Sequence, residues 1–193
     1  MQGIKGQCFH EDLIRLKRFA KGRIYTLSQK GLYGFETTSA LVSALRRAGF
    51  DSFVILERRN VLRWLVSAEI GIQHKVWHVR SLDPPKPKAV NIPLRFDEGI
   101  SLYDRLLAIE SWYPQLRTCL AGSPVLNLTY ENDIVPAPTA AYRLVCDFVG
   151  VEAKETAIYT GVVNPFPLQK TITNFDEVRG YLNGTRFEWM INE

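Results

Sequence analysis

The sequence contains few cysteines, and it lacks the motifs by which many nucleotide and metal sites are recognised. Its 193 residues include three widely spaced cysteines, an odd number, so neither a disulfide framework nor a cysteine-based metal site is predicted. Neither GxxxxGK[ST] nor GxGxxG occurs in the chain. His74 and His78 are four residues apart but have no third ligand nearby in the sequence, so we predict no metal. The cysteine usage indicates a reducing compartment, and we expect the cytoplasm.

Long apolar runs are also missing. No segment approaches the ~18 consecutive apolar residues of a membrane span, and the N-terminal MQGIKGQ lacks the apolar core of a signal peptide. The composition is that of a globular chain, 46% hydrophobic and 11% aromatic, and its length favours one domain over residues 1–193. A formal charge of +4 suits an anionic ligand, and most of it is expected on solvated surface, so no nucleic-acid partner is predicted.

The clearest pattern is a helix, a strand and a second helix in succession. A helix is predicted from Thr38, or the residue before it, to about residue 48, and Gly49 ends it. Phe53–Leu56 is a short apolar run of β-formers, which predicts a buried strand. A second helix opens at Val61, directly after the good N-cap residue Asn60. This order indicates an α/β protein with a parallel sheet flanked by helices.

Further elements follow along the chain. Ser81–Pro93 holds four prolines and is predicted to be a surface segment. Pro114 interrupts a long helical pattern, so a kink or a restart is expected there. The alternation VLNLTY predicts a second strand over Val125–Tyr130. The predicted helices after residue 100 are 102–120, 139–149 and 175–182.

The turn between the first strand and its helix has the features of an anion site. Arg58 and Arg59 follow the strand directly, where a helix N-terminus offers free N–H groups and the positive end of its dipole. A guanidinium adds a fork of donors matched to phosphate. Asn60, Arg63 and Ser67 are spaced by three and four residues, so they fall on one face of the helix. The stretch therefore predicts phosphate binding.

An ordered series of motifs resembles the sulfotransferases that use 3′-phosphoadenylyl sulfate, nearest to the bacterial carbohydrate-sulfotransferase-like members. Phe53–Ser67 resembles the family's strand–loop–helix in which an arginine, followed eight positions later by a serine, holds the donor's 3′-phosphate, and Arg59 and Ser67 have that spacing. Val125–Asp133 resembles a later strand ending in a YED-like motif, with Asn132 where an acidic residue is common. Asp147-Phe-Val-Gly-Val resembles an FLGV-type helix ending. The similarity covers roughly residues 1 to 190.

The resemblance implies a P-loop NTPase-like sulfotransferase fold and roles for further residues. Arg63 is expected to assist at the phosphate, Tyr130 to pack near adenine, and Lys170 to meet a phosphate in a region that returns to the nucleotide. The family uses a His or Glu as general base after its next strand. His10 is the candidate here, with Glu11 in reserve, and an N-terminal helix residue without a task is the alternative.

The sequence departs from the family's pattern in one respect, and this departure leaves more than one interpretation of the function open. The first strand and the loop that grips the 5′-phosphosulfate are expected to be missing, because Gly3-Ile-Lys-Gly resembles the family's next strand. The first interpretation is sulfuryl transfer to a hydroxyl of a carbohydrate or small-molecule acceptor, with a homo-oligomer left open. The second is a truncated, non-catalytic nucleotide-binding remnant or partner subunit. The third, a nucleic-acid-binding domain, is supported only by the basic charge.

Overall fold

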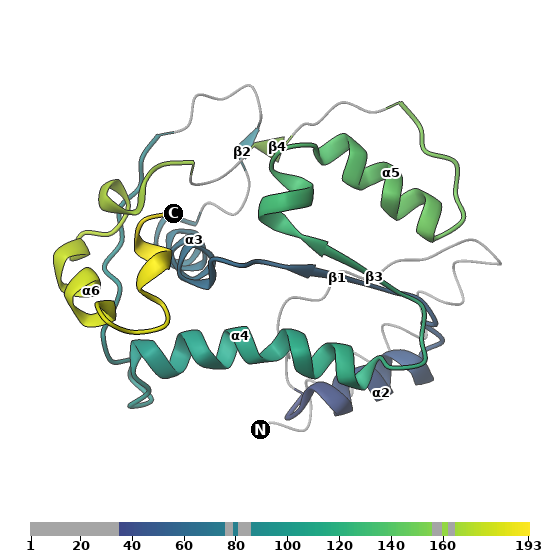
Figure 1. Ribbon diagram of the computed structural model, residues 1–193, viewed down its shortest axis with the longest axis horizontal. Helices are drawn as coiled ribbons and strands as arrows, with labels where there is room; N and C mark the ends of the chain where they lie inside the picture. Colours follow the sequence, from purple (N-terminus) through teal and green to yellow (C-terminus); the bar gives the residue numbers. More distant parts are fainter. Residues whose placement is uncertain (1–34, 76–78, 81–85, 156–159, 162–164) are drawn as a thin grey trace. The chain divides into compact units, whose positions relative to one another are not determined.

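The computed structural model describes residues 35–75, 79–80, 86–155, 160–161 and 165–193 of the chain (Figure 1). These residues form a mixed α/β structure with a small parallel sheet, in which β1 (Phe53–Glu57) pairs with β3 (Val125–Thr129). The predicted α/β class and parallel pairing are therefore confirmed. The chain divides into two compact units, one made of residues 1–55 and 112–126 and the other of residues 56–111 and 127–193.

The first unit contains helix α2 (Thr38–Arg47), which begins and ends as the sequence predicts. The Thr37 hydroxyl accepts a hydrogen bond from the Ala40 N–H at 3.1 Å, and Gly49 follows the helix with a φ of 88°. Such a left-handed backbone suits glycine because it has no Cβ. The core of this unit is a cluster of buried and partly buried side chains: Val42, Ile55, Leu120, Phe53, Tyr113, Leu116, Cys119 and Val125.

The strand β1 is less buried than its apolar sequence predicts. Ile55 is buried, whereas the side chains of Val54 and Leu56 are 42% and 48% exposed. Successive side chains of a strand point to opposite faces of the sheet, so only one face of β1 is covered. The prediction that the strand over Phe53–Leu56 is buried is wrong for Val54 and Leu56, although the strand itself is confirmed.

The second unit contains helix α3 (Val61–His74), which begins where the sequence predicts. The Asn60 side chain caps it by accepting a hydrogen bond from the Arg63 N–H at 2.9 Å. Leu62, Leu65 and Val66 of this helix are all buried. The C-terminal 3-10 turn η3 (Glu188–Ile191) contacts α3 and helix α6 (Phe175–Leu182), and Figure 1 shows this end of the chain beside α3.

Two segments contain prolines for which the sequence made predictions. Helix α4 (Leu102–Cys119) is continuous through Pro114, so it does not restart there, and the expected kink stays a prediction. The end of the proline-rich segment is not all surface, because Val90 and Ile92 are buried. Val90 forms a parallel bridge with Ile172, and its N–H donates to the main-chain oxygen of Thr171 at 3.0 Å. Burial of this backbone is therefore accompanied by hydrogen bonding.

The remaining elements lie between β3 and the C-terminus, apart from β2. A π-helical turn, η1 (Tyr130–Ile134), follows β3 directly and contacts helix α5 (Pro138–Phe148). The short strands β2 (Val79–Arg80) and β4 (Thr160–Gly161) form an antiparallel pair. Helices α5 and α6 confirm the two predicted helices in this region to within one residue at each end.

Candidate functional site

The turn between β1 and α3 is closed by a carboxylate of the protein itself. The N–H groups of Arg59 and Asn60 donate to the two carboxylate oxygens of Glu131, at 3.0 Å and 3.3 Å. Glu131 follows β3, and in a parallel pair the carboxyl ends of both strands lie at the same edge. An acidic group is stabilised here by the positive end of the α3 dipole. Two of the N–H groups expected to be free for a ligand are therefore already satisfied.

The first arginine of the turn belongs to the same cluster. The Nε of Arg58 lies 3.8 Å from a Glu131 oxygen, and both side chains are largely buried. The Arg58 guanidinium also lies over the Tyr130 ring, 4.7 Å from its centre, within the range of a cation–π contact. Tyr130, predicted to pack near adenine, thus has an arginine against one face of its ring.

Asn60 and Arg63 connect the start of α3 to the C-terminal segment. Asn60 is only 1% exposed, and its side-chain N–H donates to the main-chain oxygen of Met190 at 2.9 Å. The guanidinium of Arg63 donates to the main-chain oxygens of Phe166 and Glu193, at 3.1 Å and 2.7 Å. These contacts give both residues a structural task on the helix face that was expected to meet phosphate.

Arg59 differs from its neighbours because its side chain is exposed. Its guanidinium lies 5.9 Å from the centre of the Trp189 ring, at the outer limit of a cation–π contact. Within the described ranges, none of the ion pairs involves Arg59. The backbone of Arg59 is fixed by Glu131, while its side chain is exposed and its guanidinium has no hydrogen bond or ion pair with another residue that the structure describes.

The other predicted site residues have no described hydrogen bond with Arg59. Ser67 is partly buried within α3 and Lys170 is exposed at the end of the 3-10 turn η2 (Leu168–Lys170), and no hydrogen bond found in the described part of the chain joins either side chain to Arg59. The candidate bases His10 and Glu11 lie outside the described residues. The structure therefore brings Arg59 and Tyr130 into one cluster, through Arg58 and Glu131.

Two residues of this region were missed by sequence reasoning. Glu131 could have been found, because the end of a second parallel strand lies at the same sheet edge as the end of the first. Trp189 carries no such signal, since its exposure beside Arg59 depends on how the C-terminal segment packs. A single tryptophan near the end of a chain is equally compatible with a core position.

Comparisons with known protein families, with curated proteins and with solved structures found no match. The class that the fold defines is a mixed α/β protein with a parallel strand pair and an arginine-bearing strand–helix turn. No helix in the described part of the chain is long and apolar enough to cross a membrane. The described residues also contain no group of three or more His, Cys, Asp or Glu side chains placed to hold a metal ion.

Proposed function

We propose that this protein binds 3′-phosphoadenylyl sulfate and transfers its sulfuryl group to a hydroxyl of a carbohydrate or small-molecule acceptor, within a P-loop NTPase-like sulfotransferase fold. In this reaction the acceptor oxygen attacks sulfur in line, a general base takes the hydroxyl proton, and 3′,5′-adenosine diphosphate leaves. His10 and Glu11 are the candidates for that base.

The observation that carries the proposal is the exposed guanidinium of Arg59 at the carboxyl end of β1. In α/β sheets, ligands bind outside the carboxyl ends of the strands. A guanidinium that is held at its backbone but open at its donors is suited to bidentate contact with phosphate. Arg59 has this combination, whereas both Nη groups of Arg63 already donate to main-chain oxygens.

Glu131 changes how phosphate would be held at this turn. Its carboxylate accepts from the N–H groups of Arg59 and Asn60, so side chains rather than those N–H groups would bind the 3′-phosphate. Ser67 lies about 9 Å along α3 from Val61 at a rise of 1.5 Å per residue. Arg59 and Ser67 have the eight-residue spacing of the family's 3′-phosphate pair, and they are the pair proposed to bind the phosphate.

Calorimetry with 3′,5′-adenosine diphosphate tests the binding. We expect micromolar affinity, and we expect Arg59→Ala to weaken it about 10- to 150-fold, the equivalent of one charge-assisted contact of about 1.5–3 kcal/mol. Arg105→Ala is the matched control, because Arg105 is also exposed and its guanidinium lies 5.5 Å from the centre of the Phe96 ring. Equal affinities of the two variants would exclude a specific role for Arg59.

A transfer assay then tests the reaction. The protein is incubated with 3′-phosphoadenylyl sulfate labelled at sulfur and a panel of sugars and small hydroxyl compounds, and labelled product is measured. We expect product that depends on Arg59. Nucleotide binding without any product would instead indicate the non-catalytic nucleotide-binding protein.

A further inference from the structure

Helix α5 has apolar side chains on its exposed side as well as on its buried side. Ala141 and Cys146 are the buried residues of the helix. On the other side, Ala140 is exposed and the Leu144 side chain is 48% exposed. Residues four positions apart lie on one face of a helix, so Ala140 and Leu144 form an exposed apolar stripe, the α5 stripe. Val151, just beyond the helix, is exposed as well.

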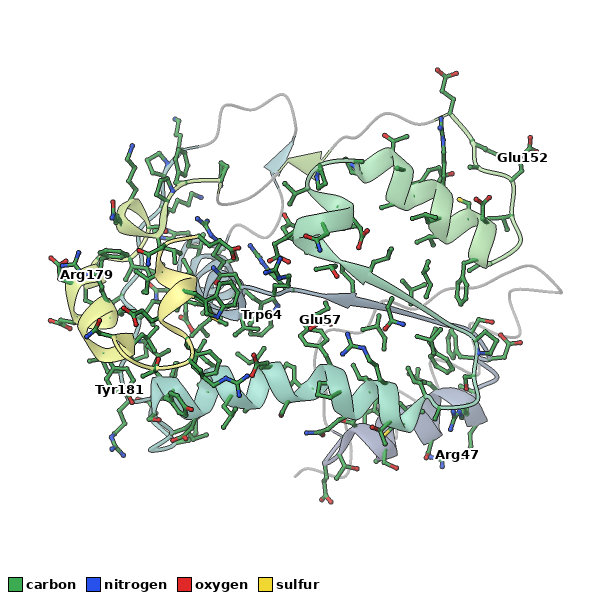
Figure 2. All side chains as sticks on the ribbon, viewed as in Figure 1. Arg47, Glu57, Trp64, Glu152, Arg179 and Tyr181 are labelled. Atoms are coloured by element: carbon green, nitrogen blue, oxygen red, sulfur yellow. The ribbon has the colours of Figure 1, made fainter. Side chains whose placement is uncertain are left out.

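Two exposed residues of opposite charge border the α5 stripe. Arg143 and Asp147 lie about 100° and 60° round the helix from Leu144, on the same side of it. Their spacing of four residues would allow an ion pair within the helix, but no ion pair among the described residues involves either side chain. Glu152, just beyond the helix, is a further exposed charge (Figure 2). An apolar centre with a polar rim is the usual composition of a protein–protein interface.

The order of these charges matches a second copy of the same helix in antiparallel orientation. A two-fold axis halfway between Arg143 and Asp147 would place Arg143 of each copy opposite Asp147 of the other. At a rise of 1.5 Å per residue, the Leu144 residues of the two copies would be offset by only about 3 Å along the helices, so their side chains would pack together at the axis. The small side chain of Ala140 would let the two helices approach closely. The exposed face of α5 is therefore complementary to itself.

We infer that this protein forms a homodimer in which two α5 helices pack antiparallel through the α5 stripe, with two reciprocal ion pairs between Arg143 and Asp147. Charge complementarity selects the partner of an interface, and here a two-fold axis brings together opposite charges from one helix face. This pattern favours a second copy over an unrelated protein. Helix α5 has 11 residues and is about 17 Å long, so the contact is small and the dissociation constant should be micromolar. The inference does not depend on the proposed function.

Sedimentation equilibrium of the full chain tests the dimer. The apparent mass should rise with concentration from 22.0 kDa towards twice that value. Leu144→Glu should weaken self-association about 10-fold or more, because it places two like charges at the centre of the interface. Leu107→Glu is the matched control, because Leu107 is also exposed on a helix, α4, in the same unit. A wild-type mass that stays at 22.0 kDa, or equal weakening by the two variants, would refute the inference.

An exchange of charges tests the antiparallel arrangement. Arg143→Asp and Asp147→Arg each place like charges opposite one another, so each should weaken self-association about 5-fold or more. A mixture of the two single variants should form a heterodimer, because every opposing pair then has unlike charges again. The variant that carries both changes should self-associate as the wild type does. Single variants that do not associate when mixed would exclude this arrangement.

Urea denaturation of the monomer, at a concentration below the dissociation constant, tests what covers the α5 stripe. Leu144→Glu should leave the free energy of unfolding of the monomer nearly unchanged, because surface substitutions away from special features have small effects. A clear loss of stability in the monomer would show that residues of the same chain cover the α5 stripe, and the dimer inference would then fail.

Discussion

Replacing Asn60 by alanine should remove two hydrogen bonds in the second unit, a local helix cap and a long-range contact with the C-terminal segment. The Asn60 side chain accepts from the Arg63 N–H at 2.9 Å and so caps α3, and it donates to the main-chain oxygen of Met190 at 2.9 Å. At 1% exposure, water cannot readily replace either contact. The variant therefore tests both the helix cap and the attachment of the C-terminal segment.

The expected loss follows from these two contacts. Loss of an asparagine cap costs about 0.5–2 kcal/mol, and a buried carbonyl left without its donor costs about 1–3 kcal/mol. We therefore expect Asn60→Ala to lower the free energy of unfolding by about 1.5–5 kcal/mol. That is a large part of the ~5–15 kcal/mol that stabilises a typical native protein.

Urea denaturation followed by far-UV circular dichroism measures this loss. Thr37→Ala is the matched control, because Thr37 also caps a helix but is exposed, with its hydroxyl accepting from the Ala40 N–H. We expect about 1 kcal/mol for Thr37→Ala. Asn60→Asp keeps a capping oxygen but loses the donor to Met190, so it should also destabilise the protein. If Asn60→Ala and Thr37→Ala cost the same, the contact with Met190 contributes nothing and the reasoning is refuted.

Two further variants test the turn and the other end of α3. Glu131→Gln retains one acceptor oxygen but loses the charge. It should lower the free energy of unfolding by about 1–2 kcal/mol and speed hydrogen exchange of the Arg59 and Asn60 amides. Unchanged exchange at both amides would contradict the closure of the turn by Glu131. Lys75 follows α3 with a φ of 56°, a left-handed backbone that favours glycine. Lys75→Gly should therefore raise the free energy of unfolding by about 0.5–1 kcal/mol in the same urea assay, and a loss of stability would argue against that backbone.

The local features of this protein could be predicted from the sequence because each depends on residues a few positions apart. Thr37 and Asn60 cap their helices through N–H groups three residues later, and Gly49 ends a helix through its own backbone freedom. A short apolar run likewise identified β1, and the N-cap residue Asn60 identified the start of α3. The candidate Arg59 was found in the same way, from its position between a strand and a capped helix.

The surroundings of that arginine were decided by tertiary structure alone. Glu131 reaches Arg59 across 72 positions of the chain, and Met190 meets Asn60 across 130. Periodicity and capping describe neighbours in sequence, so they could not show that a carboxylate would take the N–H groups of the turn. They also could not show that the Arg59 guanidinium would lie over the Trp189 ring. The sequence by itself determined where an anion site could form, and long-range packing decided which of its groups remain free to bind a ligand.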